Sequence, residues 1–345
     1  MKAEESDILV FGTGSIGGTV AAWLATAHDP AKLTVLDRPE NAGVIRENGL
    51  IVHKKGKIAA NLGLKTNVVT DVSEHPAPDI VIIAVKNYDL EAAAKEIKAK
   101  LRSHPLVIAI QDGAYNERLL RGYFKRVIYG VVCFNAEREA PNSFAYQARG
   151  PILFGILDDI LKLDLESIVA HFKRCFPCGS TKRLLDAARC KIVVNLANCA
   201  TALVGHGTRP IAKPLALKQV TVNLLWEGVQ ILQKAGVKEV PLGTLPSWKA
   251  IRKVATLPSL LTNGTYKKSI KRMLMSSMAQ DLYLLRSGFT ELDSINGYMV
   301  ELADRVGFNA RYNKAIYQIA KESFSLPDFT PIDENDLLTR VKALI

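Results

Sequence analysis

One lysine and two asparagines lie close together in the stretch CKIVVNLANCATALVG. Lys191, Asn195 and Cys199 are four residues apart, so they share one face of a helix, and Asn198 lies beside them. Their neighbours are almost all apolar, which predicts that this face is buried. Burying a lysine there costs free energy unless its charge is paired or it has a functional role. Burial also lowers the pKa of a lysine toward the working pH, which suits a proton donor. The alternative is a lysine at the helix edge whose ammonium group reaches water.

A glycine-rich stretch, ILVFGTGSIGG, has the spacing of a phosphate-binding turn. Gly12, Gly14 and Gly17 follow a strand-like run and precede an alanine-rich helical pattern that starts with Ser15 and Ile16. The first glycine permits the tight turn, the second lets the backbone approach a pyrophosphate, and the third lets helix and strand pack closely. The N-terminus of that helix then faces the phosphates. A glycine turn without a ligand is the alternative.

The next strand-like run ends in TVLDRP and carries two charges of opposite sign. Asp37 lies 20 residues after Gly17, where a residue that binds the ribose of a dinucleotide belongs. Its carboxylate alone favours NAD, because it repels a 2′-phosphate. Arg38, the next residue, favours NADP, because a guanidinium binds phosphate well. An exposed ion pair with no ligand is the alternative for both.

Polar residues also follow two later strand-like runs. Lys86 comes after DIVIIAV, and Gln111, Asp112 and Asn116 come after LVIAI. Ligands of open parallel sheets bind at the carboxyl ends of the strands, so we expect these side chains on the same rim as the glycine turn.

Composition excludes several classes of protein. A chain of 345 residues with 48% hydrophobic and 23% charged residues is a globular protein with room for two domains. The polar start, MKAEESD, resembles neither a secretory signal nor a membrane span, and five cysteines suggest no disulfide framework, so we expect a cytoplasmic protein. Cys175 and Cys178 have C-x-x-C spacing without a second pair, so we expect two ordinary thiols and no metal site.

The net charge of +11 is concentrated in the second half. Residues 180–345 hold 23 Lys and Arg against 13 Asp and Glu, whereas residues 1–179 hold 22 against 21. The basic residues are not clustered with aromatic residues as on a nucleic-acid surface. We therefore expect an anionic small molecule as the partner, and neither a nucleic acid nor a membrane.

The elements that position these residues follow from periodicity. Continuous apolar runs alternate with helical patterns in the first half, which predicts strands buried on both faces of a parallel sheet. Residues 144–148 and 151–157 suggest a closing hairpin. The apolar runs cover residues 7–12, 33–37, 79–85, 106–111 and 126–132.

Long helical patterns follow from about residue 184, and the final stretch, residues 325–338, suggests a loop with a short helix or a frayed tail. We place a boundary near Cys175 to Ser180. The predicted architecture is an α/β Rossmann-type doubly wound parallel sheet over residues 1–179 and an all-α domain over residues 180–345, with the lysine in the second domain.

Taken together, these motifs resemble one family, the ketopantoate reductases (2-dehydropantoate 2-reductases), over nearly the whole chain. The resemblance rests on GTGSIGG, RENGL, VKNYD, QDGAYNE, KIVVNLAN and SSMAQDL…TELDSING, of which the last two are specific. It implies NADPH-dependent reduction of a branched 2-oxo acid to a 2-hydroxy acid on the route to pantothenate.

The resemblance also implies a role for individual residues. Lys191 would be the general acid, Asn195 would position the substrate, and Ser277 would contact its carboxylate. Glu291 would hydrogen-bond the substrate and support the site. Arg38 and Lys86 would favour the 2′-phosphate of NADPH. Asn198 is a further expected substrate-binding residue. The expected oligomeric state, if the chain assembles, is a homodimer.

Three positions differ from the family pattern. Asp112 replaces an asparagine, Cys199 stands where a second asparagine is usual while Asn198 comes one place earlier, and two extra residues precede Glu291. These differences leave open another 2-oxo acid, or an imine as in opine-type dehydrogenases, as the substrate. Asp37 leaves open the use of NADH. A non-catalytic sensor of NADP is a third hypothesis, although a sensor needs no Lys191.

Overall fold

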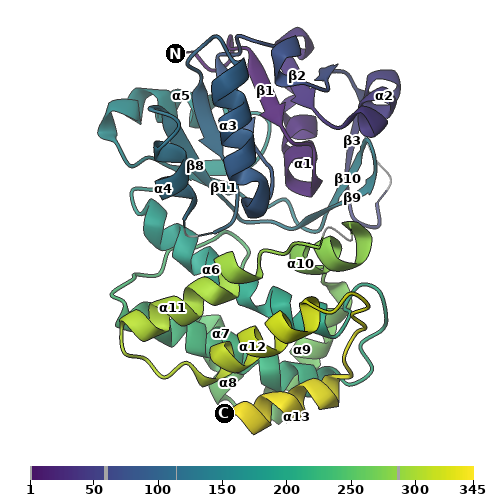
Figure 1. The fold of residues 1–345 in the computed structure, drawn as a ribbon, viewed down its shortest axis with the longest axis vertical. Helices are drawn as coiled ribbons and strands as arrows, with labels where there is room; N and C mark the ends of the chain where they lie inside the picture. The colour runs from purple at the N-terminus through teal and green to yellow at the C-terminus, as the bar shows by residue number, and fades with distance from the viewer. Residues whose placement is uncertain (1, 58–60, 114, 286–287) are drawn as a thin grey trace. The chain divides into compact units, whose positions relative to one another are not determined.

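The computed structural model describes residues 2–57, 61–113, 115–285 and 288–345, and the chain forms two compact units, Met1–Leu184 and Leu185–Ile345 (Figure 1). Each unit is described by itself. The boundary lies a few residues after the expected one, because β12 (Cys178–Ser180) still pairs with a strand of the first unit. In the described part of the chain, no helix has both the length and the apolar character needed to cross a membrane.

The first unit contains an eight-stranded sheet in the order β12-β11-β8-β7-β6-β1-β2-β5. The six strands from β8 to β5 are mutually parallel, and β11 runs antiparallel to β8. Every residue of β1, β6, β7 and β8 is buried, as their continuous apolar runs predict. The strands are β1 (Ile8–Phe11), β2 (Leu33–Leu36), β5 (Asn67–Val69), β6 (Ile80–Ile83), β7 (Leu106–Ala109), β8 (Val127–Val132), β11 (Ile152–Gly155) and β12.

A second sheet in this unit has the order β4-β3-β10-β9. Its strands are β3 (Leu50–Lys54), β4 (Asn61–Leu64), β9 (Ala136–Ala140) and β10 (Ser143–Tyr146). The hairpin expected from residues 144–148 and 151–157 is therefore wrong. β10 pairs with β9 and β3, whereas β11 joins the large sheet beside β8.

Helix α1 (Ser15–Leu24) lies between the two sheets, since it packs on β1 and β2 of one and on β3, β9 and β10 of the other. Gly18 makes this approach possible, because a Cβ there would lie 2.0 Å from the ring of Phe144 on β10. The other helices of the unit are α2 (Pro39–Asn48), α3 (Leu90–Lys100), α4 (Asn116–Arg121) and α5 (Lys162–Phe172).

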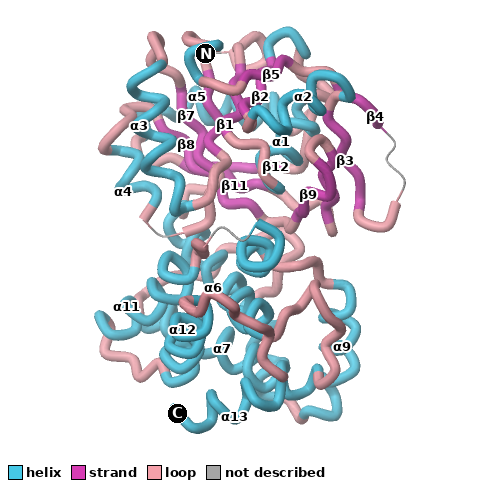
Figure 2. The backbone as a smooth tube through the Cα atoms, turned by 45° about the vertical axis from the view of Figure 1, so that its right-hand side comes forward, coloured by secondary structure: helices cyan, strands magenta, loops and turns pink. Residues whose placement is uncertain are grey.

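The second unit is built from helices, and Figure 2 shows its described residues as helix and loop, without a named strand. Helix α7 (Pro214–Lys234) packs against α8, α9, α11, α12 and α13, and at Gly228 it lies against Val193 and Leu196 of α6. The remaining helices are α6 (Leu184–Leu203), α8 (Trp248–Thr256), α9 (Ser259–Arg272), α10 (Ser277–Ala279), α11 (Tyr298–Arg305), α12 (Arg311–Phe324) and α13 (Glu334–Leu344).

The C-terminus is better ordered than the expected loop with a short helix or frayed tail. Helix α13 has 11 residues, and the carboxylate of Asp333 accepts a hydrogen bond from the backbone N–H of Asn335 at its start. Leu337 and Val341 are fully buried. The Asp333 cap and packing on α7 therefore hold this helix together.

Candidate active site

The glycine turn has the geometry that its spacing predicts. Gly12 has a φ of +98°, which favours glycine, and Gly17 could not carry a Cβ, because that atom would lie 1.9 Å from the carbonyl oxygen of Gly12. A Cβ at Gly14, in contrast, would have no neighbouring atom within 4 Å. The turn is thus tight on its inner side and open at Gly14, as a loop that admits a phosphate requires.

Helix α1 starts directly after this turn at Ser15, followed by Ile16. Its N-cap residue, Gly14, offers no side-chain acceptor to the first N–H groups. Because the first N–H groups of a helix have no acceptor within the helix, this end suits an anion.

Asp37 follows β2 and is buried, with 7% of its surface exposed. Both carboxylate oxygens accept hydrogen bonds inside the first unit: Oδ2 from the Thr13 hydroxyl and from Arg138 Nη2 (2.6 Å), and Oδ1 from the backbone N–H of Arg38 (2.7 Å) and from Asn41 Nδ2 (3.1 Å). Arg138 and Asp37 form a largely buried ion pair. Arg38 itself is exposed and is the N-cap residue of α2.

Lys86 follows β6 and is the N-cap residue of a short 3₁₀ turn, Asn87–Asp89. Burial raises the pKa of Asp89, and the positive charges of Arg38 and Lys86 oppose that rise. Both cations therefore lie close enough to Asp89 to act on its charge. The two residues expected to hold a 2′-phosphate thus follow the carboxyl ends of β2 and β6, the two parallel strands on either side of β1.

Gln111 and Asp112 follow β7 on the same rim, as expected. Gln111 Nε2 donates to the carbonyl oxygen of Ile83, and its Oε1 is buried without a hydrogen-bond partner among the described residues. The carbonyl oxygen of Asp112 accepts hydrogen bonds from the side-chain amides of Asn87 and Asn116, the latter at 3.2 Å. The loop is thus held to the end of the neighbouring strand.

In the second unit, α6 carries the lysine face. Lys191 has 4% of its surface exposed, Asn195 has 5% and Cys199 has none, so the predicted buried face is confirmed. Lys191 retains 4% exposure, so its role as a proton donor and the alternative of an ammonium group that reaches water both stay predictions. Burial raises the pKa of the Cys199 thiol, so this group stays neutral.

Two other segments of the second unit contact α6. The hydroxyl of Ser276, next to Ser277, donates to the carbonyl oxygen of Asn198 at 3.4 Å. Nδ2 of the fully buried Asn296 donates to the carbonyl oxygen of Leu196, also at 3.4 Å. The backbone near Ser277 and the segment that follows Glu291 are thereby joined to the helix of Lys191.

Glu291 is a buried carboxylate with 5% of its surface exposed. The two extra residues expected before it fall within residues 282–289, of which 286 and 287 lie outside the described residues, and a π-helical segment, Gln280–Leu285, covers the start of this stretch. A π-helical turn accommodates an added residue without ending the helix.

The cysteine pair is consistent with ordinary thiols. Burial raises the pKa of Cys175 to about 11 and that of Cys178 to about 12, so neither is a ready nucleophile. In the described ranges, no group of three His, Cys, Asp or Glu side chains is placed to hold a metal ion.

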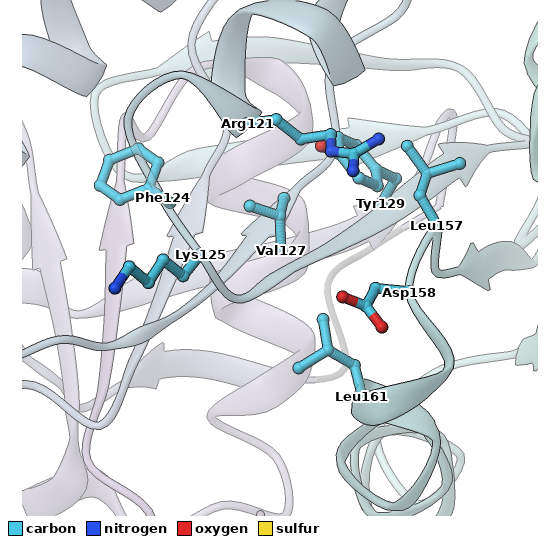
Figure 3. A pocket seen from close by; sticks show the side chains of 8 residues that line it. All are labelled: Arg121, Phe124, Lys125, Val127, Tyr129, Leu157, Asp158 and Leu161. Carbon is cyan, nitrogen blue, oxygen red and sulfur yellow. The ribbon is translucent and has the colours of Figure 1, made fainter.

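One pocket of the first unit has a volume of about 310 Å³ and lies at the amino end of β8, where Val127 and Tyr129 line it (Figure 3). Arg121, Lys125 and Asp158 supply its charged groups. None of the expected site residues lines it, so it is separate from the glycine turn.

Sequence reasoning missed three residues. Thr13 lies within the predicted glycine turn, but only the structure shows its bond to Asp37. Arg138 lies 101 residues away from Asp37, and no motif marks it. Asn296 belongs to the SING stretch of the family motif, where a polar residue between apolar ones was the available signal.

The loop, the strand order and the buried lysine define a class: oxidoreductases with a Rossmann-type first domain and a helical second domain. Residues 8–159 match the family described as "Ketopantoate reductase PanE/ApbA", and residues 184–323 match "Ketopantoate reductase PanE/ApbA C terminal". The chain belongs to the ketopantoate reductase family, as its motifs predict.

Individual relatives agree with this assignment. A 2-dehydropantoate 2-reductase of Aquifex aeolicus is 27% identical over 337 residues, which cover 93% of this chain and 98% of the relative. A ketopantoate reductase structure from Ralstonia eutropha has 23% identity and a TM-score of 0.68, covering 91% of this chain and 97% of its own. D-mandelate dehydrogenase with NADH and anilino(oxo)acetate has 16% identity and a TM-score of 0.71, covering 96% and 99%. The two structures establish the fold.

Proposed function

We propose that this protein reduces 2-dehydropantoate (ketopantoate) to pantoate with NADPH, and that Lys191 is the general acid. The observation that carries the proposal is a lysine with 4% exposure on one helix face with Asn195, in a chain whose curated relatives include 2-dehydropantoate 2-reductases. A lysine with so little exposed surface costs free energy, so a catalytic role accounts for its presence better than a structural one.

The residues of the first unit fit the dinucleotide. The space at Gly14 and the uncapped start of α1 suit the pyrophosphate, and Arg38 and Lys86 suit a 2′-phosphate. Gln111 and Asp112 lie on the rim that would face the nicotinamide. When bound, this cofactor supplies the hydride.

The remaining chemistry belongs to the second unit. The ammonium group of Lys191 hydrogen-bonds the substrate's carbonyl oxygen, stabilises the negative charge that develops there and then gives up a proton to it. Asn195 and Asn198 orient the substrate, and the hydroxyl of Ser277 donates to its carboxylate. Glu291 accepts a hydrogen bond from a hydroxyl of the substrate. The positive charge of residues 180–345 attracts this anion.

The direct test measures the oxidation of NADPH and of NADH with ketopantoate and with a panel of other 2-oxo acids. The panel includes an acid with an aromatic side chain, because a D-mandelate dehydrogenase shares the fold. A second set of assays contains an amine, so that the reduction of an imine formed with the 2-oxo acid can be detected. We expect the highest kcat/KM with ketopantoate and NADPH. A higher kcat/KM with another acid would show that this acid, and not ketopantoate, is the substrate. Dinucleotide binding without turnover of any acid would favour the hypothesis of a non-catalytic sensor of NADP. Sedimentation velocity tests the expected homodimer.

A further inference from the structure

We propose that Arg138 determines the choice between NADPH and NADH by neutralising Asp37, and that Asp37 braces the glycine turn instead of binding the ribose. This inference rests on the proposed use of a dinucleotide. It concerns the strand end at which an acidic residue usually indicates NAD.

The carboxylate of Asp37 has no acceptor position left for a ribose. An ionised carboxylate offers about four lone-pair positions. Asp37 uses four: for the hydroxyl of Thr13, Nη2 of Arg138, the N–H of Arg38 and the side-chain amide of Asn41. Two of these partners shape the cofactor site directly, because Thr13 lies in the glycine turn and Arg38 starts α2. The ribose hydroxyls would have to displace bonds that hold the site together.

Arg138 is held in place by the second sheet. It lies on β9, its Nη2 also donates to the carbonyl oxygen of Pro141, and its guanidinium lies 5.7 Å from the ring centroid of Phe144 on β10. That ring packs directly on α1 at Gly18. The contacts of its guanidinium with Asp37, Pro141 and Phe144 therefore hold the positive charge of Arg138 beside the carboxylate at the end of β2.

The consequence is electrostatic. With Arg138 present, the Asp37–Arg138 pair is close to neutral, and the exposed Arg38, with Lys86 nearby, is the charge that a 2′-phosphate meets. Without Arg138, an uncompensated carboxylate stands at the same strand end. It would repel the phosphate and regain one acceptor position for a ribose hydroxyl.

The experiment measures the dissociation constants of NADPH and NADH by calorimetry, without any 2-oxo acid. Arg138→Met should lower the preference for NADPH by about tenfold or more, which is the effect of one uncompensated charge near the phosphate. Arg138→Lys retains the positive charge and should retain most of the preference. The double variant Asp37→Asn with Arg138→Met removes both charges and should restore the ratio to within about threefold of the unmodified protein.

Arg149→Met is the matched control. Arg149 also lies over an aromatic ring, that of Trp23 at 5.2 Å, and donates to the carbonyl oxygen of Cys175, but it has no carboxylate partner in the described residues. Its loss should leave the NADPH to NADH ratio unchanged. The ratio matters because a merely structural loss weakens the binding of both cofactors together. If Arg138→Met is too unstable to study, Arg138→Gln removes the same charge with a side chain that can still donate to the carbonyl oxygen of Pro141, and an unchanged ratio in that variant would overturn the inference.

The outcomes separate this inference from the proposed function. If the unmodified protein binds neither dinucleotide, both fall. If both cofactors bind and the ratio is unchanged in Arg138→Met, the inference on Arg138 is overturned, whatever the substrate. A double variant that keeps the altered ratio of the single variant would also overturn it, because the effect would then not pass through Asp37.

Discussion

Replacing Lys191 by methionine separates catalysis from packing. Methionine keeps most of the volume of the buried side chain and removes the ammonium group, so the cost of burying a charge disappears. Since only 4% of the Lys191 surface is exposed, the melting temperature should stay the same or rise. Its loss as a general acid should lower kcat by about 10²–10⁴, equivalent to about 2.7–5.5 kcal/mol of transition-state stabilisation.

The second unit offers a matched control. Lys218 on α7 has 6% of its surface exposed, and its Nζ donates to Thr262 Oγ1 at 2.6 Å and to Asn263 Oδ1 at 2.8 Å. Lys218→Met should change stability and leave kcat within about twofold, because neutral groups already satisfy this lysine. NADPH oxidation at saturating ketopantoate and thermal melting should be measured for both variants. A Lys191→Met enzyme with unchanged kcat and an altered melting temperature would refute the catalytic role.

Three further predictions concern stability. Gly17→Ala places a Cβ 1.9 Å from the carbonyl oxygen of Gly12, so it should cost about 1–3 kcal/mol of unfolding free energy and weaken dinucleotide binding; an unchanged urea midpoint would contradict this. His28 Nδ1 and His171 Nε2 lie 2.9 Å apart, and burial lowers the pKa of both rings. Each ring stays neutral more readily when folded, so stability should be complete above the unfolded pKa of about 6.5 and fall as the pH drops below it. The slope approaches about 1.4 kcal/mol per pH unit for each added proton, and urea unfolding between about pH 7.5 and 5 would show a flat line if the pair is irrelevant. Glu227 accepts two backbone N–H bonds at the start of α12, so Glu227→Ala should cost about 2–4 kcal/mol, whereas an unchanged melting temperature would show that water replaces the cap.

Much of the fold could be predicted because its signals are local. Continuous apolar runs indicate strands that are buried on both sides, and the runs at β1, β6, β7 and β8 form such strands. The four-residue spacing of Lys191, Asn195 and Cys199 predicts a shared helix face, and the structure buries it. The hairpin prediction failed because the pairing of strands is not a local property of the sequence. Two neighbouring strands pair with each other only if no better partner exists, and β10 and β11 each have one in a different sheet.

The sequence alone determined which residues face inward on each element, and it identified the family through short motifs whose spacing carries their meaning. Only the tertiary structure decided what Asp37 contacts. At the level of the sequence, Asp37 is a carboxylate at a strand end followed by an arginine, and either charge could control the site. Its ionic partner lies 101 residues away on a strand of the second sheet. An ion pair depends on distance in space, and that distance is set by the packing of α1 between two sheets, which no local pattern contains.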